Sequence, residues 1–291
     1  MTLDTFGKSF ATTSEVFGQK VKHWPEPAPL SEHGNARIIA VVNQKGGVGK
    51  TTTTINLGAS LAELGRKVLL VDFDPQGALS VGLGVATHEL ERSVYHLLLD
   101  RTASIDQVLL KTSVPGMDLL PSDITLSGAE VSLVNEVARE QTLARVLEPA
   151  VGEYDFILID CQPSLGLLTV NALTAADSVV VPLECEYFAL RGVKLLMEII
   201  QKVQERLNPQ LEVDGILATM FDSRTLHSRE VLSRIAEAFP DRVFETVISR
   251  TVRFPETTVA GEPITTYASS SDGAAAYRRL ARELLAKGAQ K

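Results

Sequence analysis

Several features are scarce in this chain of 291 residues. Cysteine occurs only twice, which excludes a disulfide scaffold and is typical of a reduced cytoplasm. No apolar run approaches the roughly 18–20 residues of a membrane span, and the N-terminus lacks the apolar core of a signal peptide. Basic residues are outnumbered, because 28 Lys and Arg against 36 Asp and Glu leave a net charge of −8. That balance argues against coating nucleic acid over the whole surface, but it permits a local basic patch.

The first 36 residues differ from the rest of the chain. They contain Pro25, Pro27 and Pro29 within polar runs, so residues 1–36 are predicted to be a disordered tail. Phe17 and Trp24 lie on either side of Val21 at a helical spacing, which would suit a short amphipathic turn formed on binding a partner. A solvated leader is the alternative. Residues 37–291 are expected to form one domain.

From residue 37 onward, short apolar runs alternate with helical patterns. Runs of this kind are typical of parallel strands that are buried on both faces. We therefore predict an α/β fold with a single doubly wound, mostly parallel sheet flanked by helices, as in P-loop NTPases. The predicted strands cover 38–42, 68–71, 156–159, 179–181, 216–220 and 243–248, and the predicted helices cover 51–64, 165–173 and 188–207.

The strongest motif is a glycine-rich loop between the first predicted strand and the first predicted helix. It reads N-Q-K-G-G-V-G-K-T-T over residues 43–52. Glycines let a backbone turn tightly and present N–H groups to phosphate oxygens, and a helix N-terminus adds partial positive charge. We expect Lys50 to reach the β- and γ-phosphates, Thr51 to ligate Mg²⁺ and Thr52 to support the α-phosphate. The loop residues expected to bind ATP are Lys45, Gly46, Gly47, Val48, Gly49, Lys50, Thr51 and Thr52.

This loop departs from the strict pattern G-x-x-x-x-G-K-[ST] at one position. Gln44 stands where the first glycine belongs, and a second lysine, Lys45, follows it. Lys45 comes too early in the loop to cradle the same phosphates as Lys50 easily. One physical option is that Lys45 reaches a nucleotide held by a second subunit and stabilises charge on the transferring phosphoryl group.

The motif K-G-G-V-G-K-T-T resembles the deviant Walker A loop of the ParA/MinD ATPases, most closely their chromosomal ParA, or Soj-like, branch. Other segments resemble the same family over residues 37–288, namely V-D-F-D-P-Q-G at 71–77, F-I-L-I-D at 156–160, E-Y-F-A-L-R-G at 186–192 and T-M-F-D-S-R-T at 219–225. The resemblance implies a nucleotide-switched dimer in which Lys45 crosses the interface, so that Lys45, Lys50 and Asp74 are the catalytic set.

Carboxylates follow two of the predicted strands. Asp72 and Asp74 lie two residues apart and so point the same way, and Asp160 ends another strand. In a parallel sheet that edge binds ligands, so these groups are candidates to hold Mg²⁺ and its waters. The resemblance assigns Asp74 to the hydrolytic water, and Asp72 and Asp160 to the metal shell together with Thr51. Capping of the following helix is the alternative role for each aspartate.

The resemblance also assigns contacts to adenine and to DNA. Met220 and Thr251 would line the base, although Ser249 and Thr251 depart from the usual family pattern. Arg224 and Arg253 would contact duplex DNA without sequence preference, since arginine forks bind phosphates well. A solvated surface charge is the alternative for each arginine.

The function that follows is a cytoplasmic, nucleoid-associated ATPase of the ParA type. It would use ATP and Mg²⁺, form an ATP-dependent homodimer, bind DNA non-specifically and partition a chromosome or plasmid with a ParB-like activator. One alternative is a related positioning ATPase that acts on another cargo or a division component. Another is an iron–sulfur redox protein, although Cys161 and Cys185 lack a C-x-x-C spacing. No bulky apolar anchor follows Gly288, so no membrane partner is expected.

Overall fold

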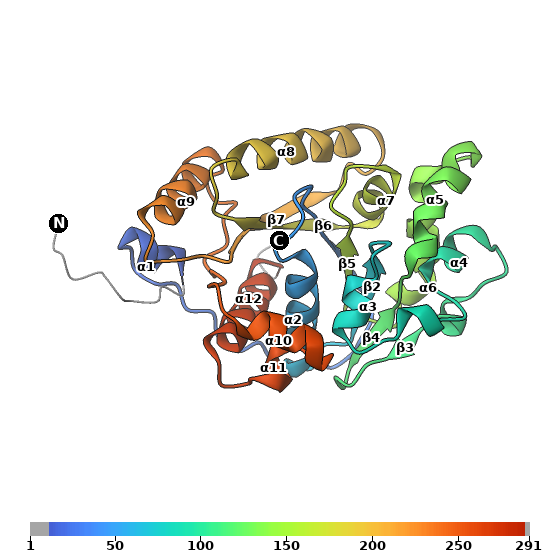
Figure 1. Ribbon diagram of the computed structural model, residues 1–291, viewed down its shortest axis with the longest axis horizontal. Helices are drawn as coiled ribbons and strands as arrows, with labels where there is room; N and C mark the ends of the chain where they lie inside the picture. Colours follow the sequence, from blue (N-terminus) through green and yellow to red (C-terminus); the bar gives the residue numbers. More distant parts are fainter. Residues whose placement is uncertain (1–11, 289–291) are drawn as a thin grey trace.

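The strands arise where aliphatic and β-branched residues run without interruption. In the computed structural model, which describes residues 12–288, they join into a seven-stranded sheet of order β3-β4-β2-β5-β1-β6-β7 (Figure 1). All neighbouring strands are parallel except β3, which runs antiparallel to β4. The strands are β1 (Arg37–Val41), β2 (Val68–Phe73), β3 (Leu110–Lys111), β4 (Met117–Leu120), β5 (Phe156–Cys161), β6 (Ser178–Glu184) and β7 (Glu212–Thr219).

Helices cover both faces of this sheet, so the predicted doubly wound α/β fold is confirmed. Figure 1 shows α8 and α9 on one side and α2, α10, α11 and α12 on the other. The helices are α1 (Thr13–Phe17), α2 (Lys50–Glu63), α3 (Ala78–Gly82), α4 (Val94–Leu99), α5 (Ser127–Ser132), α6 (Thr142–Val151), α7 (Leu167–Ala175), α8 (Ala189–Arg206), α9 (Leu226–Ala238), α10 (Arg253–Ala260), α11 (Ile264–Tyr267) and α12 (Asp272–Gly288). Short 3-10 turns lie at Thr87–Glu89, Ile105–Gln107, Ile124–Leu126, Leu133–Asn135 and Arg139–Gln141.

The two faces of the sheet bury two separate cores. Along β1, Ile38 and Ala40 face the core that includes α6 to α9, whereas Ile39 faces the core that includes α2 and α12. Alternate residues of one strand therefore contact different helices. The side chains on both faces of the strand must be apolar for this reason. No helix among residues 12–288 is long and apolar enough to cross a membrane.

The strand order places the ends of β1, β2 and β5 next to one another. β5 lies between the other two, with Val41 opposite Asp160 on one side and Asp72 opposite Asp160 on the other. The glycine-rich loop leaves the end of β1 and leads into α2. The sheet topology thus brings the loop and the aspartates together at the carboxyl edge, where open α/β sheets bind ligands.

The predicted strand at 243–248 was wrong, and the hydrogen bonds explain why. Phe244 and Ile248 donate backbone N–H groups to Ile216 and Ala218, as a strand beside β7 would. Between them, the N–H groups of Glu245 and Thr246 donate to the carboxylate of Glu283 on α12, at 2.7 and 2.9 Å. This buried carboxylate interrupts the ladder, so that only isolated bridges form. β3 and β4 were not predicted from the sequence, because both strands are short and contain the charged residues Lys111 and Asp118.

The N-terminal segment is more ordered than the sequence suggested over residues 12–17. The Thr12 hydroxyl oxygen caps α1 by accepting the Glu15 N–H. The Glu15 carboxylate accepts the Thr12 N–H, which completes a capping box. Thr13 and Ser14 then donate to the carboxylate of Glu245, which lies beside α12. The T-x-x-E spacing was the available signal. Residues 18–36 form no helix or strand, and residues 1–11 of the expected tail lie outside the described part.

Candidate nucleotide-binding site

The glycine-rich loop has the backbone shape that its glycines allow. Gly47 and Gly49 adopt left-handed conformations with φ of 75° and 84°, which favour glycine, and α2 begins directly afterwards at Lys50. The loop is braced by residues that sequence reasoning missed. The amide of Asn43 binds both the Lys45 N–H and the Pro182 carbonyl, and the Thr219 hydroxyl donates to the Val48 carbonyl at 2.7 Å. These braces hold the loop open towards the helix N-terminus.

Lys50 lies inside the loop with only 7% of its surface exposed. Burial lowers the pKa of its ammonium, whereas the charges of Asp160 and Asp74 raise it. Its Nζ donates to the Lys45 carbonyl, a long contact of 3.4 Å. A buried cation in a glycine-rich loop at a helix N-terminus is well placed to neutralise phosphate charge.

Asp160 is the penultimate residue of β5 and contacts the first turn of α2. It accepts a hydrogen bond of 2.7 Å from Thr51 Oγ1 and a longer one of 3.5 Å from Thr54. Its carboxyl group is fully buried, and burial together with the nearby charge of Asp72 raises its pKa. A cation beside Asp160 would reverse that shift, because an opposite charge favours the ionised carboxylate.

Asp72 is fully buried near the end of β2 and is hydrogen-bonded within the protein. It accepts hydrogen bonds from both the N–H and the hydroxyl of Ser80 in α3, at 2.8 and 2.6 Å. Burial raises its pKa to about 7 despite those bonds. These two bonds fasten α3 to the end of β2, and Asp72 lies opposite Asp160 in the sheet.

Asp74 lies two residues further on, at the mouth of the site. Its Oδ1 accepts the Gln76 N–H at 2.9 Å, which fixes the carboxylate, and its residue surface is 9% exposed. The charges of both Asp74 and Asp160 act on Lys50, so the sheet edge brings this set together.

The donor set fits Mg²⁺ rather than a metal that needs a protein cage. Residues 12–288 contain no group of three or more His, Cys, Asp or Glu that could hold a metal ion. Mg²⁺ keeps most of its waters and takes one or two protein oxygens together with substrate phosphates. Thr51 Oγ1 and the Asp160 carboxylate, already in contact, provide such oxygens beside the phosphate loop.

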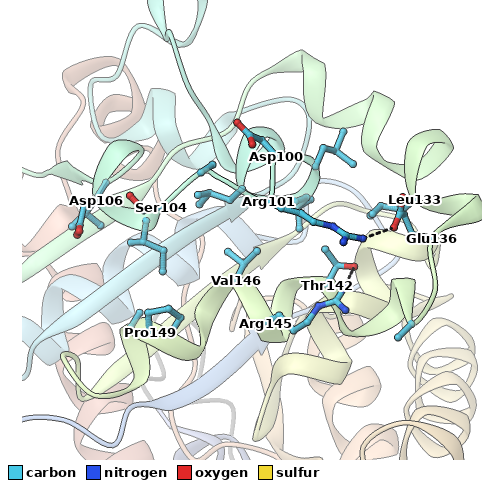
Figure 2. Close-up of a pocket in the computed structure, with 18 of the residues that line it drawn as sticks. Asp100, Arg101, Ser104, Asp106, Leu133, Glu136, Thr142, Arg145, Val146 and Pro149 are labelled. Atoms are coloured by element: carbon cyan, nitrogen blue, oxygen red, sulfur yellow. Dashed lines mark hydrogen bonds and ion pairs between the residues drawn. The ribbon is translucent and has the colours of Figure 1, made fainter.

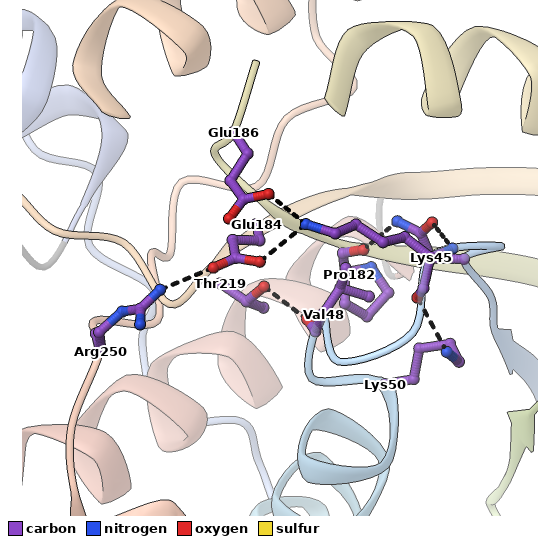
Figure 3. A network of polar contacts seen from close by, with 9 residues as sticks. Lys45, Val48, Lys50, Pro182, Glu184, Glu186, Thr219 and Arg250 are labelled. Atoms are coloured by element: carbon purple, nitrogen blue, oxygen red, sulfur yellow. Dashed lines mark hydrogen bonds and ion pairs between the residues drawn. The ribbon is translucent and has the colours of Figure 1, made fainter. Parts of the chain in front are cut away.

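Lys45 takes the opposite direction from Lys50. Figure 3 shows its side chain extending away from the loop towards Glu184 and Glu186. Its Nζ donates to Glu184 at 3.1 Å and to Glu186 at 2.5 Å, and 48% of the side chain is exposed. Burial lowers the pKa of Lys45, but the hydrogen bonds to these two carboxylates outweigh it and raise the pKa. One lysine of the loop thus faces inward and the other faces the surface.

The residues expected to line the base come from two segments that lie side by side. Phe221 donates to the Ile248 carbonyl and accepts from the Arg250 N–H, which joins the end of β7 to residues 248–250. Met220 precedes this junction in a left-handed conformation with φ of 49°, which is uncommon for a residue other than glycine. Thr251 follows it, and its hydroxyl accepts the Arg253 N–H.

The two arginines expected to contact DNA are exposed, but each is paired within its own segment. Arg224 makes two bonds to Asp222 in the same turn, and these bonds lower the pKa of Asp222 to about 2. Arg253 begins α10 and donates to Glu256 at 2.9 Å. Binding a phosphate at either position requires the arginine to turn from its carboxylate.

Both cysteines are free and buried. Burial is the first cause that raises the pKa of the Cys161 thiol and, to about 12, that of Cys185. Protonated buried thiols are unreactive and poor metal ligands.

A cavity of about 870 Å³ opens far along the sheet from the phosphate loop, among α4, α6 and the turn at 136–138 (Figure 2). Leucine, valine and proline side chains line it together with polar and charged ones, including Arg101 and Glu136, which form an ion pair. None of the expected site residues lines this cavity. The residues of the predicted nucleotide site therefore lie at the loop and the sheet edge and are not part of this cavity.

Known proteins share the sequence and architecture of this chain. The AAA domain family matches residues 36–213. The sporulation initiation inhibitor protein Soj of Bacillus subtilis is 49% identical over 252 residues, covering 87% of this chain and 99% of Soj. The chromosome partitioning protein ParA of Caulobacter vibrioides is 46% identical over 253 residues, covering 86% of this chain and 94% of that protein.

A solved structure resembles the chain over a similar extent. It is the cobyrinic acid a,c-diamide synthase of Mycobacterium smegmatis with a bound ATP analog and magnesium. That protein is 45% identical, the match covers 86% of this chain and 94% of the other, and the TM-score is 0.77. A sequence and a fold this close place the phosphate loop of the present chain in a nucleotide-binding context.

Proposed function

The chain belongs to the Soj/ParA family of ATPases, and from that premise we propose that it is a partitioning ATPase whose ATP state is a DNA-binding dimer. Its reaction is the hydrolysis of ATP with Mg²⁺. The finer parts of the proposal are the dimer, the DNA contact, a ParB-like activator and a place on the nucleoid.

The observation that carries the proposal is that the side chains of the two loop lysines point in opposite directions. Lys50 is buried beside Asp160, whereas the Lys45 ammonium lies at the surface and points away from its own phosphate loop. A lysine that cannot serve its own nucleotide is suited to serve one held by a second copy. Tyr187 and Phe188, which are 74% and 73% exposed, follow Glu186 directly and form an edge-to-face pair. Exposed aromatic rings directly after Glu186, a partner of Lys45, support a contact surface there.

Each residue of the site then has a role in hydrolysis. The loop N–H groups and Lys50 bind the β- and γ-phosphates, and Met220 and Thr251 flank the base. Asp74, held by the Gln76 N–H, orients the attacking water. Thr51 and Asp160 hold Mg²⁺, with Asp72 behind them, and when bound this ion neutralises charge on the phosphates. Lys45 of a second copy stabilises charge on the transferring group.

The experiment that tests the proposal separates binding from assembly. Lys45→Ala should bind a fluorescent ATP analogue almost as the parent does, because Lys50 and the loop remain. It should lose ATP-dependent dimerisation, measured by light scattering, and ATP hydrolysis. Lys202→Ala, which removes an exposed lysine on α8, is the matched control. A Lys45→Ala protein that still dimerises as the parent does overturns the cross-subunit role.

DNA binding is proposed for the dimer alone. The net charge of −8 makes a single copy a poor ligand for duplex DNA, whereas a dimer doubles any local patch around Arg224 and Arg253. The related positioning ATPase, acting on a different cargo, is distinguished by DNA binding that is equal in ATP and ADP or absent in both.

The name of the solved M. smegmatis relative favours a second candidate, ATP-dependent formation of an amide. A synthase that takes ammonia from glutamine needs a reactive nucleophile such as a thiolate. Cys161 and Cys185 are buried and have raised pKa values, which argues against that role for either thiol. ATP hydrolysis without any acyl substrate, accelerated by duplex DNA, supports the partitioning ATPase. Hydrolysis that requires a carboxylic acid and an ammonia source supports the synthase.

A further inference from the structure

Lys45 is held within its own subunit by a carboxylate clamp, which we define as Glu184 and Glu186. Glu184 ends β6, and Glu186 lies in the turn that leads to α8. Both carboxylates accept from Lys45 Nζ, so this single ammonium has two acidic partners (Figure 3). The Asn43 amide holds the Lys45 N–H at 2.9 Å and so fixes where the side chain leaves the loop.

The two carboxylates of the clamp differ in burial. The Glu184 side chain is 13% exposed, whereas that of Glu186 is 56% exposed. A mostly buried carboxylate that loses its only cation is left with an uncompensated charge, which is costly. Arg250 prevents this, because its guanidinium donates to the other oxygen of Glu184 at 2.7 Å. Glu184 therefore stays paired when Lys45 leaves, and the clamp can open reversibly.

We propose that Glu184 and Glu186 are positioning residues that restrain Lys45 within its own subunit, so that the clamp must open before Lys45 can serve a nucleotide on a second copy. The inference rests on the proposed function, because it concerns the same lysine and the same dimer. Arg250 belongs to the segment that precedes Arg253, so the clamp also links the phosphate loop to the start of α10.

A direct test measures the clamp without assembly or turnover. The nucleotide-free protein is treated with an amine-selective N-hydroxysuccinimide ester, and the modification of each lysine is followed by peptide mass spectrometry. In Glu184→Gln with Glu186→Gln, Lys45 should react about threefold to tenfold faster, because losing the two carboxylates lowers its pKa and each pKa unit changes the reactive amine tenfold. Lys202, exposed on α8, serves as the internal reference.

The second measurement asks whether the clamp restrains assembly. The same double variant should dimerise with ATP at a protein concentration about 5- to 25-fold lower than the parent. One exposed ion pair shifts an equilibrium by up to roughly fivefold, and a dimer opens two clamps. Glu198→Gln with Glu205→Gln removes the same two charges from exposed positions of α8, and so controls for the general loss of negative charge.

The outcomes separate the two proposals. Unchanged Lys45 reactivity in the clamp variant shows that the clamp does not hold the lysine and overturns the inference. Faster modification of Lys45 with unchanged dimerisation shows that the clamp does not restrain dimerisation, and this also overturns the inference. Dimerisation that improves equally in the α8 control variant overturns the inference too. If the parent and every variant stay monomeric with ATP, the proposed dimer fails, and with it the regulatory role of the clamp.

Discussion

Lys50 and Asp160 carry opposite charges at buried positions. An isolated charge at either position would lower the stability of the folded protein. Lys50 is 7% exposed and Asp160 is fully buried, and each moderates the pKa shift that burial imposes on the other. Among the described residues, no salt bridge joins Lys50 directly to Asp160. In the proposed function, phosphates beside Lys50 and Mg²⁺ beside Asp160 would each supply an opposite charge.

Replacement of Lys50 by alanine tests the phosphate loop. Without the ammonium, the phosphates keep only the loop N–H groups, so ATP should bind weakly or in the wrong position and hydrolysis should be lost. Steady-state phosphate release at saturating ATP measures the effect, with Lys194→Ala on the exposed surface of α8 as the control. Near-normal turnover in Lys50→Ala would show that the loop is not the catalytic phosphate site.

Replacement of Asp74 by alanine tests the chemical step. A group that orients water acts on the rate rather than on binding, and its loss commonly costs roughly 10²- to 10⁴-fold in rate. Asp74→Ala should therefore bind ATP and dimerise, yet remain in the ATP state. Single-turnover hydrolysis and light scattering on the same samples check both parts. Normal hydrolysis, or no ATP binding at all, assigns the water to another residue.

Segments distant in sequence are joined by buried carboxylates. Glu283 of α12 binds the backbone at 245–246, and Glu245 in turn binds the start of α1. Directly before β5, Asp155 accepts from the backbone N–H groups of Gly34 and Lys67 and from the His33 ring. These contacts tie the N-terminal segment to the domain at two points.

Asp155→Asn tests the second of these anchors. Burial acts to raise the pKa of Asp155, but the hydrogen bonds from Lys67, His33 and Gly34 outweigh it and the pKa is lowered. A carboxylate with a lowered folded pKa stabilises the protein above its unfolded pKa, about 3.9, and loses that effect as pH falls through the folded value. We expect Asp155→Asn to cost about 1–3 kcal/mol at pH 7 and progressively less below about pH 4.

Urea unfolding across a pH series measures the free energy of unfolding of this variant. Asp106→Asn, at an exposed position in a 3-10 turn, should change stability little at any pH and is the control. A cost that is the same at pH 7 and pH 3 would contradict the charge-based role of Asp155.

At the scale of the whole molecule, the proposed DNA switch combines the net charge of the chain with the proposed dimer. The chain has a formal net charge of −8, and both candidate DNA-binding arginines are paired with acidic neighbours. A single copy should thus bind duplex DNA poorly. Two patches on one rigid dimer gain from effective concentration, so a nucleotide-driven change in assembly can switch DNA affinity sharply.

Arg253→Ala tests this switch. With contacts to phosphate, log K should fall by about 0.9 per neutralised phosphate for each tenfold rise in salt. Removing about two contacts per dimer should lower the slope by about 2 and leave ATP-driven dimerisation unchanged. Fluorescence anisotropy on unrelated duplexes with ATP and ADP measures it, with Arg101→Ala, at the rim of the distant cavity, as the control. An unchanged salt slope would remove Arg253 from the DNA contact.

The sequence by itself determined the local parts of this protein. Uninterrupted apolar runs specify β1, β2, β5 and β6, because strands buried on both faces tolerate little else. The loop at 43–52 specifies the strand–turn–helix shape, since Gly47 and Gly49 adopt conformations that other residues avoid. Asp74 and Asp160 could be assigned to the same sheet edge because each directly follows or ends such a strand.

Only the tertiary structure decided how distant residues share their charges and hydrogen bonds. The ladder at 243–248 is interrupted by Glu283, which is 38 residues from Glu245, and α1 depends on Glu245. Asp72 accepts a hydrogen bond from Ser80. The Lys45 side chain is directed outward by Glu184 and Glu186, which lie more than a hundred residues away in the sequence. Hydropathy and spacing report which side chains are buried. They do not report which buried donor meets which acceptor, because strand order and helix packing set those distances.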